Sequence, residues 1–153
     1  MSIKIQTADL DTPEFAELMD AHADLMLRLT PPGSCHFIPL DGLRAEDVTV
    51  WEIRDGDILV GSGALKHLDD ANGELKTMHT LESRRGDGLG RKMLEHIIAE
   101  ARARGYKKLS LETGGTEAFL PSRRLYAAHG FETCGPFGDY VEDPHNVFMA
   151  LQL

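Results

Sequence analysis

Residues 74 to 113 constrain the fold more than any other part of the chain. Glu74 to Glu82 alternates apolar and polar residues with a period of two, which predicts a strand. From Leu89 the apolar spacing becomes helical, and Gly105 is placed to cap the C-terminus of that helix. Lys107 to Thr113 predicts the next strand. Because a crossover helix joins them, the two strands are expected to run parallel in one sheet.

The first of these strands is expected to have two different faces. One alternate set is interpreted as the core face and consists of Leu75, Thr77, His79 and Leu81. The opposite set is free to line a cleft and consists of Lys76, Met78, Thr80 and Glu82. This assignment places His79 among core residues.

The N-terminal part of the chain predicts a strand, a long helix and a short helical turn. Residues 2–7 alternate as a strand does, and Asp11-Thr12-Pro13-Glu14 carries the start signals of a helix that runs to about Leu29. Pro31-Pro32-Gly33 ends that helix and opens a loop, which is followed by helical turn signals near residues 41–46. A loop in this position is a candidate lid.

Two turn signals organise the strands that follow. Asp55-Gly56-Asp57 separates two β-rich runs, residues 47–54 and 58–67, and predicts an antiparallel hairpin. Asn72-Gly73 predicts a second turn of the same kind before the strand at Glu74.

The C-terminal part predicts one more helix and one more strand. Pro121 opens a short helix that reaches about His129, and residues 146–151 form the last predicted strand. The turn-rich segment 134–146 either closes over a cleft or contacts a second subunit, so a homodimer is an open alternative. With no internal repeat and no linker, residues 1–153 are expected to form a single domain.

Composition excludes several classes of protein. A net charge of −9 and a pI near 5.2 argue against binding to nucleic acid or to an anionic membrane surface. Cys35 and Cys134 form no CxxC pair and the seven histidines show no ligand spacing, so neither a disulfide nor a metal site is expected. The chain has no apolar signal-peptide core and no run of about 18 apolar residues. The expected compartment is the cytoplasm.

Residues 84–90, Arg-Arg-Gly-Asp-Gly-Leu-Gly, lie where the predicted strand gives way to the helix. Glycines there allow backbone N–H groups to approach an anion, and the helix dipole adds partial positive charge. Two common phosphate-binding patterns do not fit, because Arg91 stands where both the P-loop and the dinucleotide fingerprint need a glycine. Met93 also replaces the Ser or Thr of a P-loop.

Two motifs that do fit point to one family. Arg85, Gly88 and Gly90 form the pattern Arg-x-x-Gly-x-Gly, and residues 125–131 read Leu-Tyr-Ala-Ala-His-Gly-Phe. Together they resemble the pyrophosphate loop and the Leu-Tyr-x-x-x-Gly-Phe segment of the GNAT superfamily of N-acetyltransferases. The resemblance implies an α+β (mixed α/β) fold with a central, mixed, mostly antiparallel twisted sheet, one splayed parallel strand pair and helices on both faces. It departs from the family at Phe119, where many members have an asparagine that contacts the pantetheine arm.

The resemblance also implies acetyl-CoA as co-substrate, with no metal, and a site for it along the strand and the loop. Backbone N–H groups from Met78 to Thr80 are expected to polarise the thioester carbonyl, and the loop is expected to hold the diphosphate. The expected cofactor-binding residues are Met78, His79, Thr80, Arg85, Gly86, Asp87, Gly88, Leu89, Gly90 and Arg91.

Transfer to an amine needs a proton acceptor and a proton donor, because an alkylammonium with a pKa of about 10.4 cannot attack and a thiolate must leave. Family position gives Tyr126 the role of acid; the alternative is an amphipathic residue that packs its short helix. Glu112, on the strand at 107–113, is the first candidate base, with an ordinary strand carboxylate and an ordered water as the alternatives. His79 is the weaker candidate.

The acceptor is predicted to be a small primary amine with some likeness to an amino acid. His36 and Lys76 are candidates to recognise a carboxylate on it, and ordinary surface residues are the alternative. Direct attack in a ternary complex is favoured because neither cysteine lies near a motif. A non-catalytic module that senses acyl-CoA is the alternative from another class.

Overall fold

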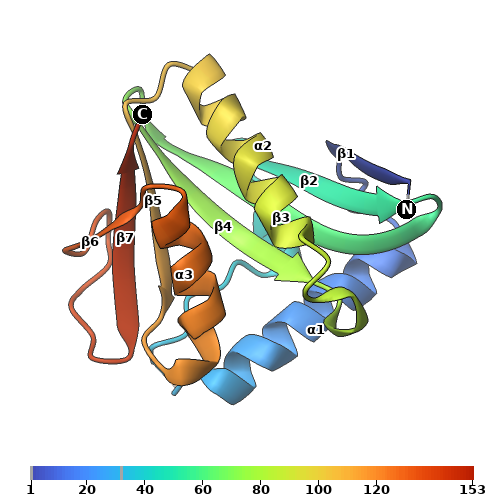
Figure 1. Cartoon of the computed structure of the whole chain (residues 1–153), viewed down its shortest axis with the longest axis horizontal. Coiled ribbons are helices and arrows are strands. Elements are labelled where there is room, and N and C mark those ends of the chain that lie inside the picture. Colours follow the sequence, from blue (N-terminus) through green and yellow to red (C-terminus); the bar gives the residue numbers. More distant parts are fainter. Residues whose placement is uncertain (1, 32) are drawn as a thin grey trace.

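The computed structural model describes residues 2–31 and 33–153, which form one seven-stranded sheet covered by helices on both faces (Figure 1). The strand order is β1-β2-β3-β4-β5-β7-β6, and among these residues only the pair β4–β5 is parallel. The strands are β1 (Ile3–Thr7), β2 (Val48–Asp55), β3 (Ile58–Asp69), β4 (Asn72–Thr80), β5 (Lys108–Gly114), β6 (Glu132–Cys134) and β7 (Asn146–Gln152). The fold class expected from the sequence is confirmed.

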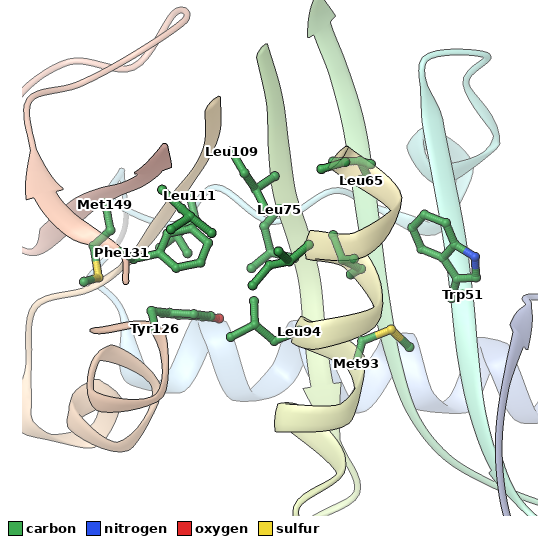
Figure 2. Close-up of a cluster of buried hydrophobic side chains, with 14 of the residues drawn as sticks. Trp51, Leu65, Leu75, Met93, Leu94, Leu109, Leu111, Tyr126, Phe131 and Met149 are labelled. Atoms are coloured by element: carbon green, nitrogen blue, oxygen red, sulfur yellow. The ribbon is translucent and has the colours of Figure 1, made fainter. Parts of the chain in front are cut away.

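The helices enclose two separate cores. One face of the sheet carries α2 (Leu89–Ala103) and α3 (Leu120–Ala128), and α1 (Pro13–Leu29) packs on the other. The described residues also include three short 3-10 helices, namely η1 (Leu40–Arg44), η2 (Glu82–Arg84) and η3 (Glu117–Phe119). The larger core lies between the sheet and the pair α2 and α3, where Leu75, Leu94 and Leu111 meet (Figure 2). The smaller core packs Phe15 and Leu18 of α1 against β2 and β3.

Helix α1 begins and ends where its sequence signals place it. The Thr12 hydroxyl accepts a hydrogen bond of 3.2 Å from the backbone N–H of Phe15, and Pro13 occupies the first turn. Thr30 is extended, as expected for a residue before a proline. This helix therefore carries its inward-facing residues to a fixed position over the sheet.

The turn between β3 and β4 differs from the prediction. It lies at residues 70–71, and Asn72 and Gly73 are the first residues of β4. Asn72 donates from Nδ2 to both carboxylate oxygens of Asp69, at 2.8 and 3.0 Å, which steadies the turn. A Cβ at Gly73 would lie 2.9 Å from Leu65 and Tyr106, so this glycine serves close packing within the sheet.

A bulge in β4 overturns the predicted assignment of its faces. Thr77 has a φ of +58°, and the register with β3 shifts between the pairs Ser62–His79 and Ala64–Lys76. The bulge reverses the alternation, so that Leu75 packs in the core under α2 and α3 whereas His79 contacts His22 of α1 on the opposite face. The prediction that His79 shares a face with Leu75 is wrong, because a single inserted residue changes the face of every residue after it.

Strands β4 and β5 diverge soon after they start. Their pairing covers Asn72–Lys108, Gly73–Leu109 and Glu74–Ser110, and stops there. The backbone edge of β4 beyond Glu74 therefore has no strand partner on the β5 side. This splayed pair, which the family resemblance implied, opens the sheet at its centre.

Candidate active site

Two adjoining cavities occupy the opening between β4 and β5. The large cavity, of about 550 Å³, extends from the loop before α2 toward α3. The small cavity, of about 120 Å³, lies toward β5 and the loop after α1. The residues common to both linings are Met26, Met78, Phe119, Ser122 and Tyr126. The two cavities therefore meet at one junction.

The glycine-rich loop forms one end of the large cavity. Gly86 and Gly88 have φ values of +88° and +80°, a left-handed conformation that glycine adopts at little cost, and Gly88 is the N-cap of α2. The first amides of a helix have no acceptor within it, so those of α2 are available to an anion. The predicted cofactor-binding residues in this lining are Met78, His79, Thr80, Arg85, Gly86, Gly88, Leu89, Gly90 and Arg91.

Asp87 is the predicted loop residue outside that lining, and it contributes to the shape of the loop. Its Oδ2 accepts a hydrogen bond of 2.8 Å from Nε of Arg84, while Nη2 of Arg84 lies 3.0 Å from Oδ2 of Asp55. Asp55 also accepts from the backbone N–H of Ser2, and that hydrogen bond, followed by Arg84, lowers the pKa of its carboxyl group. Arg84 thus ties the loop to the β2–β3 hairpin, a role that the sequence pattern did not reveal.

The two predicted loop arginines differ in their surroundings. Nε of Arg91 lies 3.1 Å from Oε2 of Glu95, one turn along α2, and that carboxylate also contacts His129 at 3.1 Å. Arg85 is exposed at the mouth of the large cavity. Arg85 is thus the better placed of the two to add charge for an anionic ligand.

Tyr126 lies at the junction of the cavities. It is 7% exposed, packs on Phe131 with a centroid separation of 5.8 Å, and extends from α3 toward the α2 side (Figure 2). Burial raises the pKa of its phenol to about 12, so it keeps its proton at neutral pH. Nη1 of Arg123 donates to the carbonyls of Gly114 and Thr116, at 2.7 and 2.8 Å, which fixes α3 against the end of β5.

Glu112 lines the small cavity from β5. Its side chain is 13% exposed, and Oε1 lies 3.7 Å from Nδ1 of His36. Burial raises the pKa of the carboxyl group, and the neighbouring His36 and Lys76 only partly oppose this effect. A carboxylate with a raised pKa is a stronger base, as proton removal from an amine requires.

Lys76 also lines the small cavity, and its ammonium group already has three acceptors. Nζ donates to Oε2 of Glu74 at 3.1 Å, to the hydroxyl of Tyr140 at 2.7 Å and to the carbonyl of His36 at 3.3 Å. The Tyr140 hydroxyl in turn donates to Glu74 at 2.6 Å. Burial, followed by the charge of Glu74, raises the pKa of Tyr140. The turn-rich segment 134–146 therefore contacts Lys76, a residue of the small cavity's lining, through Tyr140.

Sequence reasoning missed Glu74 and Tyr140 as parts of this cluster. Glu74 had a local signal, because it lies two residues before Lys76 on the same strand and faces the same way. Tyr140 lies in the segment 134–146 that was expected to close over a cleft or to contact a second subunit, but its contact with Glu74, 66 residues away, depends on the path of the folded chain.

Two further residues of the cavities correct or refine the expectations. Cys35 lines the small cavity although it lies far from both motifs in the sequence. Burial raises the pKa of its thiol, which keeps the unreactive protonated form. Phe119, where many family members have asparagine, lines both cavities with an apolar ring.

A buried histidine pair lies beside the cavities. His22 of α1 lines the small cavity and His79 of β4 lines the large one, and their Nδ1 atoms are 3.2 Å apart. Burial lowers the pKa of each ring to about 4. His22 had no motif to signal it in the sequence.

Residues 2–31 and 33–153 contain neither a cluster of metal-ligating side chains nor a helix suited to span a membrane. No group of three or more His, Cys, Asp or Glu side chains there is arranged to hold a metal ion. No helix in the same part of the chain has the length and apolar character that crossing a bilayer requires.

The fold and the two cavities agree with the comparison to known families. The protein-family model described as "Acetyltransferase (GNAT) family" matches residues 8–131 of the sequence. The chain belongs to the GNAT acetyltransferase family and is an acyltransferase enzyme.

Particular relatives extend this similarity to the full chain. The N-acetyltransferase YsnE of Bacillus subtilis is 45% identical over 153 residues, which is 100% of both chains. The crystal structure of a putative acyl-CoA N-acyltransferase from Klebsiella pneumoniae has a TM-score of 0.79 at 29% identity, covering 99% of this chain and 97% of that one. A GNAT family acetyltransferase from Elizabethkingia anophelis with acetyl-CoA bound shares the fold, with a TM-score of 0.70 at 18% identity and 99% of each chain covered.

Proposed function

We propose that the protein transfers the acetyl group of acetyl-CoA to a small primary amine by direct attack in a ternary complex. The observation that carries this proposal is the junction at Tyr126, where a large cavity ending in an anion-binding loop meets a small cavity lined by a carboxylate. The acetyl-CoA bound in the Elizabethkingia relative supports a coenzyme A thioester as co-substrate.

In this proposal the cofactor lies along the large cavity. The amides at the start of α2 bind the diphosphate, with the charge of Arg85 beside them. The pantetheine arm pairs with the unpartnered edge of β4, as an added strand does. The thioester then reaches the junction, where backbone N–H groups from Met78 to Thr80 polarise its carbonyl group.

The reaction balances with side chains that line the two cavities. Glu112 accepts a proton from the ammonium group, and the amine nitrogen then attacks the thioester carbon. The C–N bond forms, the C–S bond breaks, and Tyr126 donates its proton to the departing sulfur. The nitrogen loses two protons in all, of which one ends on sulfur and one in solvent. Direct attack is favoured because the Cys35 thiol stays protonated.

The acceptor site admits a small amine. Glu112 supplies negative charge for the ammonium group, which fits a primary amine. An amino-acid-like acceptor would place its carboxylate near His36 and Lys76, where it would share the Lys76 ammonium with Glu74 and Tyr140.

The test measures acetyl-CoA binding by calorimetry and then thiol release against a panel of primary amines with and without a carboxylate. Tyr126→Phe is expected to bind acetyl-CoA with little change and to lose about 10²-fold to 10⁴-fold in kcat. Tyr106→Phe is the matched control, because its hydroxyl bonds to His67, 2.6 Å away, outside both linings. If Lys76→Ala leaves the ratio of carboxylated to uncarboxylated acceptors unchanged, Lys76 does not recognise a carboxylate.

The alternative function is a module that senses acyl-CoA without catalysis. It predicts binding of acetyl-CoA with no thiol release for any amine, in wild type and Tyr126→Phe alike. Loss of binding altogether would contradict both functions.

A further inference from the structure

The imidazole rings of His22 and His79 lie against each other, although the two residues are 57 positions apart in the chain. Both residues are 7% exposed, and the rings meet edge to face with centroids 5.0 Å apart. The only hydrogen bond that either ring makes to the described residues joins the two Nδ1 atoms, at 3.2 Å. One Nδ1 must therefore carry a hydrogen atom and the other must not, which fixes opposite tautomers on the two rings.

Both rings are neutral at physiological pH. Burial is the main cause that lowers the pKa of each to about 4, and for His79 the charges of His22 and Arg85 act in the same direction. The pair therefore consists of one donor and one acceptor, with no imidazolium.

The position of the pair gives it two outlets. His22 lines the small cavity and His79 lines the large cavity. The Nε2 atom of neither ring makes a hydrogen bond to a described residue. The pair thus connects the two cavities by a buried route that does not pass through Tyr126.

We propose that His22 and His79 relay the second proton of the attacking nitrogen from the small cavity to the large one. This inference rests on the proposed function, in which Glu112 accepts the first of the two protons. After the C–N bond forms, Nε2 of His22 accepts the remaining proton, directly or through one water molecule. Nδ1–H of His22 passes its hydrogen to Nδ1 of His79, and Nε2–H of His79 passes its own to the Tyr126 phenolate that remains once Tyr126 has protonated the sulfur.

The relay conserves charge and protons. Each ring gains one proton and loses one, so neither becomes an imidazolium and the net event moves one proton from nitrogen to sulfur. The tautomers return to their starting state by the reverse shift through solvent before the next turnover. Low basicity suits this role, because a concerted shift needs neutral rings and a strongly basic ring would retain the proton.

The kinetic test uses His22→Asn and His79→Asn, which can keep a hydrogen bond between α1 and β4 but cannot pass a proton along an imidazole. With acetyl-CoA and the amine that wild type acetylates fastest, each variant is expected to lose about 10-fold or more in kcat. Acetyl-CoA affinity should change little in His22→Asn, and the solvent deuterium isotope effect on kcat should change in both variants. His67→Asn is the matched control, because it breaks a histidine hydrogen bond to Tyr106 outside both linings.

If both variants keep the wild-type kcat and the wild-type isotope effect, the relay is overturned. It is also overturned if the variants lose stability but keep the wild-type kcat. A second measurement needs no turnover. Nitrogen-15 spectra of the histidine-labelled protein at pH 6 should show that His22 and His79 are both neutral. One of these two rings should carry Nδ1–H and the other Nε2–H. A protonated ring, or two Nε2–H rings, would overturn the relay alone. No thiol release by wild type with any amine would instead refute acetyl transfer, and the relay with it.

Discussion

The pKa values of four titratable side chains around the cavities are shifted toward their neutral forms. Burial raises the pKa of Glu112 and Tyr126 and lowers that of His22 and His79. The same physical cause therefore strengthens a carboxylate as a base, keeps a phenol protonated as an acid and keeps two imidazoles uncharged. These shifts cost stability wherever a buried group must carry charge, and this cost can be measured.

Glu112→Gln is expected to change activity and stability in opposite directions. Turnover should fall by about 10²-fold because the proposed base is lost. The free energy of unfolding should rise at neutral pH, because a buried carboxyl group with a raised pKa stabilises the folded state only while it is protonated. The gain should shrink as the pH falls through the raised folded-state pKa toward about 4.3, and below about 4.3 it should be gone, because the folded and unfolded chains then both bind the proton.

Urea unfolding of Glu112→Gln and wild type between pH 4 and pH 8, with thiol release measured in parallel, checks this prediction. A variant that is less stable at pH 8 would show that Glu112 is a structural carboxylate. The alternative that an ordered water acts as base predicts nearly unchanged turnover.

At the scale of elements, the loop and α2 form a unit whose function depends on backbone conformation. Gly88 combines a φ of +80° with the N-cap position of α2, and a Cβ there would meet no atom within 4 Å. A side chain at this position is therefore disfavoured by its backbone angle and not by crowding. It would also stand where an anion approaches the helix amides.

Gly88→Ala is expected to lower stability by about 1 to 2 kcal/mol through backbone strain and to weaken acetyl-CoA binding about tenfold. Gly56→Ala is the matched control, because Gly56 also has a positive φ, +58°, and no atom within 4 Å of an added Cβ, but lies in the β2–β3 turn. It should lose similar stability and keep its affinity. Calorimetry and urea unfolding check both, and equal affinities for the two variants would contradict the assignment of the loop.

At the scale of the whole molecule, the His22–His79 pair links the helix on one face of the sheet to the strand at its centre. Unfolded imidazoles have a pKa near 6.5, whereas both folded rings have a pKa of about 4. Between these values the unfolded chain binds more protons than the folded chain. The contribution of the pair to the free energy of unfolding is therefore complete above about pH 6.5, and it is lost as the pH falls toward 4.

The free energy of unfolding is expected to fall over this pH range by at most about 3 kcal/mol per ring. Urea unfolding at several pH values, for wild type and for the double variant His22→Asn with His79→Asn, measures the effect. Carboxyl groups titrate in both proteins, so the difference between the two curves isolates the histidines. Parallel curves would contradict the low folded-state pKa values.

The sequence by itself determined most of the order of the elements, the glycine-rich loop before α2 and the place of Tyr126. These features depend on local patterns: the helical spacing from Leu89, the glycines at 86, 88 and 90, and the cap formed by Thr12. Local periodicity and capping act within a few residues, so they can be read without the fold.

Only the tertiary structure decided which side chains meet. The bulge at Thr77 arises from the pairing of β4 with β3, and it moved His79 to the face where His22 lies. The contact of Tyr140 with Glu74 likewise depends on the path of the C-terminal segment. Strand register and long-range packing are set by the whole sheet, so no local pattern contains them.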